Sequence, residues 1–211
     1  MAAAAVALIL AGCGSAGSSG STAASTQPQP STQPAVAGSS SPVAGASSQA
    51  PVPAESNPPG DIPDTTVYVP FASATGHVTL QVPEGWSRKQ TANSVTFTSN
   101  LNSISIGWQP MKAAPTVRTA RSSTVPALRH ATLAFSLKAV HAVTLRGGPA
   151  VEIVYQVNST PNAVTGRQYR LVIERFEFFK NGRAAMLSLS SAVGSDNVDP
   201  WRIVSGSLRW A

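Results

Sequence analysis

The amino-acid sequence predicts an α+β domain, an antiparallel β-sheet with flanking helices, preceded by a disordered tether. Segments of alternating apolar and polar residues recur between residues 78 and 190, as in strands that bury one face. Helix signals occur in only two places, one in the middle of this region and one near the C-terminus. All 13 Phe, Trp and Tyr residues lie from Tyr68 onward, whereas 9 of the 17 prolines fall between Pro28 and Pro63.

Charge is divided in the same way along the chain. Residues 1–66 contain three acidic residues and no Lys or Arg, whereas the remainder has 15 Lys and Arg against six acids, a net charge of +9. This division excludes two folded domains of equal size, a coiled coil and a polytopic membrane protein. It leaves one domain of about 145 residues, enough to bury about two-thirds of its unfolded surface.

Residues 1–12 are predicted to be a signal peptide. The apolar run from Ala2 to Ala11 has ten residues, about half of the length that a membrane-spanning helix requires. It ends in Leu10-Ala11-Gly12-Cys13, which resembles the lipobox of bacterial lipoproteins. The resemblance implies cleavage before Cys13 and lipidation of its thiol. Cys13 is the only cysteine, so the chain has no internal disulfide.

Residues 13–64 are predicted to be a disordered tether that begins at the lipidated Cys13. The segment consists almost entirely of Ser, Ala, Thr, Gly, Pro and Gln. It has no aromatic and few large aliphatic residues, so burial cannot offset the loss of chain entropy on folding. The folded domain is therefore assigned to residues 65–211.

The strands of this domain are predicted from period-two alternation. Four segments have apolar residues at every second position: Val78, Leu80 and Val82; Val95 and Phe97; Ile104, Ile106 and Trp108; and Val151, Ile153, Tyr155 and Val157. The segments 167–180 and 183–190 are joined by Asn181-Gly182, which suits a type I′ hairpin turn because both residues tolerate positive φ.

One strand does not have a single apolar face. Within 170–179, Leu171, Ile173 and Phe179 share a face with Arg175 and Glu177. The opposite face mixes three apolar residues with Glu174. A bulge that changes the register, burial of both faces, or an apolar cleft with charged edges would each account for this pattern.

Two helices are expected. The sequence Ser123-Thr124-Val125-Pro126 can begin one, with Leu128, Ala131 and Leu133 on one side. Asp196 or Asn197 can cap a second over residues 198–208, which places Trp201, Val204 and Leu208 on one face.

The sequence also resembles a known family. Val82-Pro83-Glu84-Gly85-Trp86 is similar to the P-x-G-W turn of the Mog1/PsbP-like fold, and Leu145-Arg146-Gly147-Gly148-Pro149-Ala150 and Gly194-Ser195-Asp196-Asn197 fit the same pattern. Together with the lipobox, the chain resembles actinobacterial lipoproteins of the LpqN/LpqT type. The resemblance implies an α/β sandwich and a non-enzymatic accessory or ligand-binding role, and it assigns no catalytic residue.

Residue patterns for catalysis or metal binding are absent from the sequence. His77, His130 and His141 belong to no H-E-x-x-H motif, and there is neither a G-x-S-x-G nor an S-x-x-K signature. Glu174 and Glu177 are three residues apart on one strand and so point to opposite faces, which argues against an acid–base pair. We expect no enzyme activity, no metal and no cofactor.

The excess of positive charge predicts an anionic partner. Outside the cell this means lipid head groups, acidic glycolipids or wall polymers rather than nucleic acid. The candidate ligand-binding residues are Arg118, Arg121 and Arg129 near the middle helix and Arg167 and Arg170 at the start of the long strand.

The sequence therefore predicts an exported monomer, anchored by Cys13 at the outer face of the cell membrane. Its domain is expected to bind an envelope lipid or glycolipid, or a membrane transport protein. Two alternatives remain open at this point: an interaction module that docks on a membrane or host protein, and a hydrolase whose catalytic residues are dispersed in the sequence.

Overall fold

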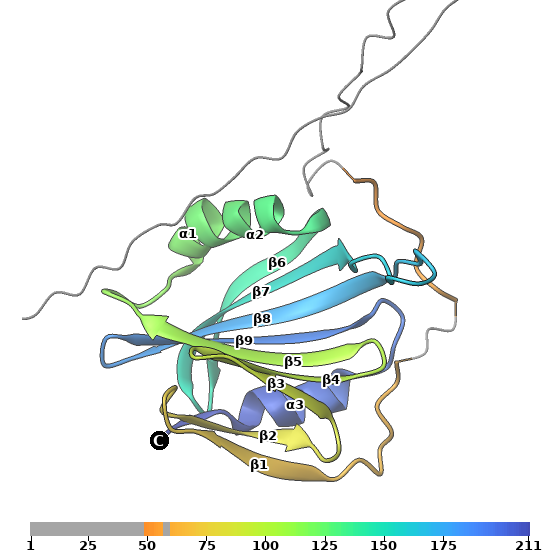
Figure 1. Cartoon of the computed structure of the whole chain (residues 1–211). Helices are drawn as coiled ribbons and strands as arrows, with labels where there is room; N and C mark the ends of the chain where they lie inside the picture. The colour runs from red at the N-terminus through yellow and green to blue at the C-terminus, as the bar shows by residue number, and fades with distance from the viewer. Residues whose placement is uncertain (1–48, 57–59) are drawn as a thin grey trace, which may run out of the picture. The chain divides into compact units, whose positions relative to one another are not determined.

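The computed structural model describes residues 49–56 and 60–211 (Figure 1). Every strand pairing within its two sheets is antiparallel. The smaller sheet has the order β1-β2-β10, formed by β1 (Tyr68–Ser73), β2 (Val78–Pro83) and β10 (Arg209–Trp210). The larger has the order β3-β4-β5-β9-β8-β7-β6, formed by β3 (Ser87–Gln90), β4 (Ser94–Ser99), β5 (Asn102–Pro110), β6 (Leu133–Leu145), β7 (Gly148–Asn158), β8 (Arg170–Lys180) and β9 (Arg183–Ala192).

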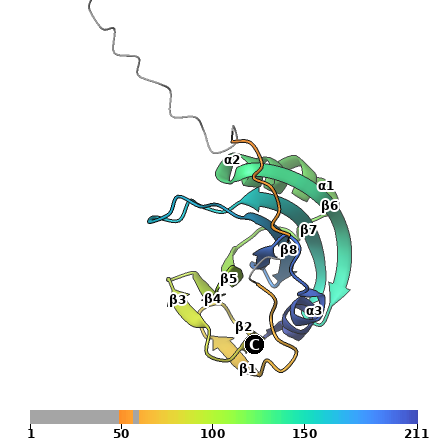
Figure 2. The same cartoon turned by 90° about the vertical axis from the view of Figure 1, so that its right-hand side faces the viewer.

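Helices flank the larger sheet on both faces. One face is covered by a continuous helical segment made of α1 (Val117–Thr119), the π-helical turn η2 (Ala120–Thr124) and α2 (Val125–Ala131). The other face packs on α3 (Val198–Ser207) and the small sheet, as the view along the strands shows (Figure 2). The predicted fold class, an antiparallel sheet with flanking helices, is confirmed.

Each face of the large sheet contributes to its own hydrophobic core. The core toward α3 includes the buried residues Ile104, Ile106, Trp108, Phe176, Phe178, Leu187, Leu189, Trp201, Val204 and Leu208. The core toward the helical segment includes Ala120, Val125, Val140, Val151, Ile153, Tyr155 and Val157, with Leu171 and Ile173 packed against it.

This double burial accounts for the mixed pattern of β8. The strand pairs without a register shift to both β7 and β9, so no bulge is needed. Phe176 and Phe178 point toward α3, whereas Leu171 and Ile173 point toward the helical segment. Of the three explanations that the sequence allowed, burial of both faces is the observed one.

The β8–β9 hairpin turns at the predicted dipeptide. Asn181 and Gly182 have φ values of 49° and 76°, the left-handed conformation that a type I′ turn requires. Lys180 and Arg183 form the last pair of the ladder before the turn.

The helical segment in the middle begins earlier than expected, at Val117. Thr116 caps it: its side chain accepts a hydrogen bond from the Thr119 N–H, and the Thr119 hydroxyl accepts one from the Thr116 N–H. Leu133 does not continue the helix but begins β6, because the chain is extended from Thr132. The predicted terminal helix is confirmed and buries Trp201 and Val204.

Residues assigned to the tether pack against the domain. The Ile62 side chain is 5% exposed, and its backbone N–H donates to Asn197 Oδ1 at 2.8 Å. The carbonyl of Gly60 accepts hydrogen bonds from the side-chain amides of Asn102 and Asn197, at 2.7 and 2.8 Å. The folded domain therefore begins before residue 65, because these buried amides need the backbone groups of residues 60–62 as partners.

Residues 49–56 also contact the domain. Asn158 accepts a hydrogen bond from the Val52 N–H at 3.0 Å and donates to the carbonyl of Ala50 at 2.7 Å. Glu55 forms an ion pair with Arg167. The signal peptide, the lipobox and Cys13 lie outside the described residues.

Strand β6 forms one edge of the large sheet, and its pairing with β7 is irregular. The register shifts between Leu133 and Ser136 and again between Leu137 and Ala139. None of the helices in residues 49–56 and 60–211 has the length and apolar character needed to cross a bilayer.

Candidate functional site

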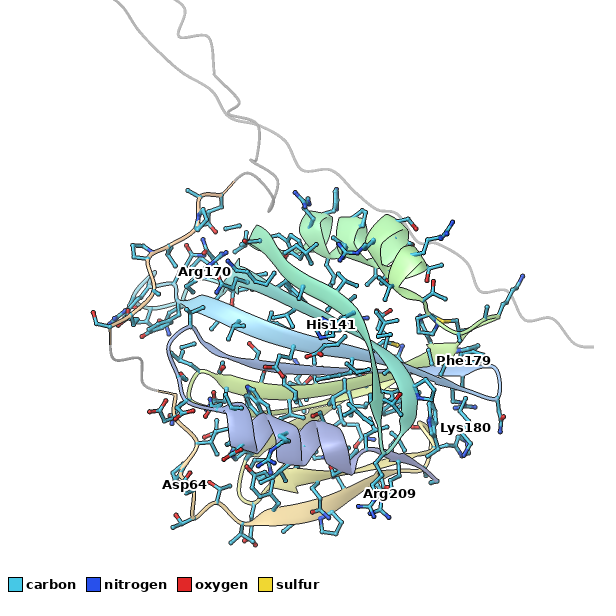
Figure 3. All side chains as sticks on the ribbon, turned by 180° about the vertical axis from the view of Figure 1, so that it is seen from behind. Asp64, His141, Arg170, Phe179, Lys180 and Arg209 are labelled. Carbon is cyan, nitrogen blue, oxygen red and sulfur yellow. The ribbon has the colours of Figure 1, made fainter. Side chains whose placement is uncertain are left out.

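Four basic residues from three parts of the chain meet at one end of the domain. Arg146 lies in the β6–β7 turn, Lys180 and Arg183 flank the β8–β9 turn, and Arg209 lies on β10. Figure 3 shows Lys180 and Arg209 on the same side of the molecule. We call these four residues the basic pole.

A hollow of about 390 Å³ lies within the basic pole. Its lining includes three of the four cations and no acidic residue: Arg146, Gly147, Gly148, Pro149, Phe179, Lys180, Arg209 and Trp210. We call it the basic hollow. Among the described residues, its three cations take part in no ion pair. An anion could therefore approach them without displacing an internal carboxylate.

A second hollow, of about 460 Å³, adjoins the first, and we call it the apolar hollow. It lies between the loop before α1 and the ends of three strands, and its lining has no charged residue: Ala114, Pro115, Thr116, Val117, Ala142, Val143, Thr144, Pro149, Ala150, Val151 and Phe179. Pro149 and Phe179 line both hollows. The two spaces are thus neighbours that share a wall.

Hydrogen bonds hold the parts of the basic pole together. The indole Nε1 of Trp210 donates to the carbonyl of Gly147 at 3.0 Å, which ties β10 to the turn that contains Arg146. The guanidinium of Arg183 donates to the carbonyl of Thr75 at 2.8 Å, which ties the β8–β9 hairpin to the small sheet. The backbone around these cations is therefore fixed by contacts between distant segments.

Acidic residues gather near the start of α3. Asp61 Oδ1 accepts a hydrogen bond from the Asp196 N–H at 2.9 Å, and Asp199 follows in the first turn of α3. Asp64 lies across the molecule from Lys180 and Arg209 in Figure 3. Asp61, Asp196 and Asp199 thus lie close together at the start of α3.

The three arginines predicted near the middle helix lie on the helical segment, away from the basic pole. Arg118 is exposed. Arg121 donates to the carbonyl of Val140 at 3.2 Å, and the guanidinium carbon of Arg129 lies 5.4 Å from the centre of the Phe135 ring. Arg121 and Arg129 line a hollow of about 390 Å³ together with Val125, Pro126 and His130.

The two arginines predicted at the start of the long strand are engaged within the protein. Arg167 lies 2.5 Å from Glu55 Oε1 and stacks over the Tyr169 ring. Arg170 is 6% exposed and donates to the carbonyl of Ala134 at 2.7 Å and to Asn158 Oδ1 at 3.1 Å. Burial lowers the pKa of its guanidinium. The five predicted arginines thus lie in two separate places.

The three histidines also lie apart. His77 occupies the β1–β2 turn with φ at 52°, and His130 is at the end of α2. His141 pairs with Glu152 through its Nε2, at 2.6 Å. Burial, and secondarily the Glu152 carboxylate, raises the pKa of Glu174 on the neighbouring strand. Within the described part of the chain, no three His, Cys, Asp or Glu side chains gather in a metal-binding arrangement.

The sequence did not reveal the basic pole, because its members are distant in the chain. The readable signal was the pair of cations that flank Asn181-Gly182, since a predicted hairpin turn must place Lys180 and Arg183 side by side. Arg146 and Arg209 could be added only once the sheet order was known.

No protein-family model matches this sequence, and no curated protein matches it. Solved structures do resemble it. The chain is similar to cyanobacterial PsbP (CyanoP) from Synechocystis sp. PCC 6803, with 13% identity and a TM-score of 0.52 over 74% of this chain and 100% of that one.

Two further solved structures are similar at lower scores. One is the Ran-binding protein Mog1p of Saccharomyces cerevisiae, with 10% identity and a TM-score of 0.44 over 65% of this chain and 83% of that one. The other is LpqN of Mycobacterium tuberculosis, described as involved in cell envelope biogenesis, with 11% identity and a TM-score of 0.45 over 69% and 91%. On the likeness to CyanoP, this chain has the Mog1/PsbP-like fold.

Proposed function

We propose that this chain is an exported lipoprotein of the cell envelope, of the LpqN/LpqT type, that acts as a non-enzymatic accessory protein. Lipid on Cys13 anchors it to the outer face of the cell membrane, and its domain binds an anionic envelope lipid or glycolipid. The lipobox-like sequence at residues 10–13 supports the anchor. The scattered positions of the histidines favour binding over catalysis.

The basic hollow is the single observation that favours an anionic ligand most strongly. Arg146, Lys180 and Arg209 line one concave site, and no carboxylate lines it with them. Arginine can donate two parallel hydrogen bonds to a phosphate or carboxylate, and lysine adds a point charge. Three cations from separate elements would surround such a head group on several sides.

The domain should therefore bind anionic bilayers through the basic pole. The probe is a set of phosphatidylcholine vesicles with and without phosphatidylglycerol, sedimented with the full chain carrying Cys13→Ala so that no lipid anchor contributes. Binding should require phosphatidylglycerol. Arg146→Gln with Arg209→Gln should weaken it by about 30-fold, because each cation near an anionic surface contributes about 1 kcal/mol.

A matched control removes two charges elsewhere. Arg121→Gln with Arg129→Gln alters the helical segment, lowers the net charge equally and should leave vesicle binding within about threefold of the parent. Equal losses in the two double variants would mean that net charge alone governs binding. That result, or no binding to phosphatidylglycerol, would refute the role of the basic pole.

The anchor has its own test. In the natural host the unaltered chain should fractionate with membranes, whereas Cys13→Ala should release it, because the thiol is the only acceptor for the lipid. Retention of the Cys13→Ala chain on membranes would contradict the lipobox assignment.

A further inference from the structure

Resting on the function proposed above, we infer that the ligand is an amphiphile whose hydrocarbon chain occupies the apolar hollow while its anionic head lies in the basic hollow. The two hollows share Pro149 and Phe179 as a common wall. A molecule that extends past Pro149 and Phe179 would contact uncharged side chains in the apolar hollow and three cations in the basic hollow. Neither surface alone would select for a molecule with both parts.

Three strand ends form the floor of the apolar hollow. Thr144 pairs with Pro149, and Ala142 pairs with Val151 in the adjacent row. Phe179 of β8 extends this floor toward the basic hollow. The opposite wall is the loop that leads into α1, including Pro115. The floor is thus made mainly of small apolar side chains on the face of the large sheet that packs against the helical segment.

The helical segment leaves this part of the sheet uncovered because of where it begins. The capping box at Thr116 and Thr119 starts the helix at Val117. Farther along the same face, large side chains fill the space under the helix, as where Phe135 stacks on Tyr155 at 5.3 Å. Near the strand ends the residues are smaller. The resulting volume of about 460 Å³ lies within the range of about 300–1,000 Å³ that is usual for ligand pockets.

Alkyl phosphates provide a direct probe of both parts of the site. Butyl, octyl and dodecyl phosphate would be titrated calorimetrically into the full chain carrying Cys13→Ala, below their micelle concentrations. Affinity should rise about fourfold for each methylene that enters the apolar hollow. Arg146→Gln with Arg209→Gln should weaken all three phosphates by a similar factor, because they share one head group.

A second variant separates the hollows. Ala142→Phe places a ring in the apolar hollow from an exposed position on β6, so the fold should tolerate it. It should abolish most of the dependence on chain length and leave butyl phosphate binding nearly unchanged. The matched control is Ala131→Phe, at an exposed position on α2 that lines neither hollow, and it should keep the parent's dependence on chain length.

The outcomes distinguish this inference from the proposed function. If all three phosphates bind equally, or if Ala142→Phe leaves the chain-length dependence intact, the amphiphile site is refuted while the anion-binding role stands. If no alkyl phosphate binds and the vesicle assay also fails, the proposed function is refuted together with it.

Discussion

Arg175 donates a hydrogen bond from its Nε to Glu177 Oε1 at 3.0 Å, on the face of β8 that packs against the helical segment α1–η2–α2. The side chains are 22% and 7% exposed, so the pair is largely withdrawn from water. Thr124, the last residue of the π-helical turn, donates to the other oxygen of Glu177 at 3.4 Å. The ion pair with Glu177 offsets the cost of withdrawing the Arg175 guanidinium from water, and Arg175 does the same for the Glu177 carboxylate.

Removal of one partner of this pair should destabilise the domain. Arg175→Met leaves Glu177 buried without its cation and should lower the free energy of unfolding by about 3 kcal/mol. Combining Arg175→Met with Glu177→Leu should recover most of this loss, because two apolar side chains then replace the pair. Urea unfolding of the three proteins measures the effect. A double variant less stable than the single one would contradict this explanation.

Glu174 should make stability depend on pH. Burial, and then the Glu152 carboxylate, raises its pKa in the folded state. The folded state therefore holds the proton more tightly than the unfolded state, and the free energy of unfolding falls as pH rises through the raised pKa. His141, which pairs with Glu152, is the other titratable group of this cluster.

Glu174→Gln cannot ionise and should therefore be more stable than the parent at neutral pH. The two proteins should have similar stability at about pH 3, where the glutamate is protonated in both states. Urea unfolding at the two pH values measures this difference. The raised pKa would be contradicted if the substitution lowered stability equally at both.

The start of the domain can be tested by truncation. A chain that begins at residue 65 lacks Ile62 and leaves the amides of Asn102 and Asn197 without the carbonyl of Gly60. It should be less stable than a chain that begins at residue 60 by about 3 kcal/mol, the usual cost of losing a buried aliphatic side chain. Thermal unfolding of the two chains measures the difference, and equal stability would place the boundary at residue 65.

Two glycines should respond oppositely to alanine. A Cβ at Gly147 would lie 2.6 Å from Leu208 Cδ2 and 3.2 Å from the Leu208 carbonyl oxygen, so Gly147→Ala should cost about 1–3 kcal/mol. A Cβ at Gly206, in α3, would meet nothing within 4 Å, so Gly206→Ala should stabilise by about 0.5–1 kcal/mol. Unfolding experiments that gave both changes the same sign would contradict this packing.

Local patterns predicted the elements whose side chains alternate regularly. The strands around Val78, Ile104 and Val151 and the turn at Asn181-Gly182 were readable because a single buried face repeats every second residue. Strand β6 was not predicted, because its register shifts break that period. The start of α1 was missed even though Thr116 and Thr119 form a readable capping box.

The candidate site was much less predictable than the fold. The excess of cations can be read from the composition. The five arginines predicted to bind a ligand were chosen because they lie near one another in the sequence. Arg170 illustrates the difference, because its burial depends on Ala134 and Asn158, which come from other strands. The basic pole arises only when two turns and β10 are brought to one end of the sheets.

The irregular pairing of β6 bears on how copies of this protein behave when crowded. A regular edge strand offers a repeating row of N–H and C=O groups on which a second sheet can add. The shifts near Leu133 and Leu137 interrupt that row, and Lys138 places a charge beside the second one. Crowded proteins collide often. The uneven edge of β6 should let such neighbours separate again instead of joining into a continuous sheet.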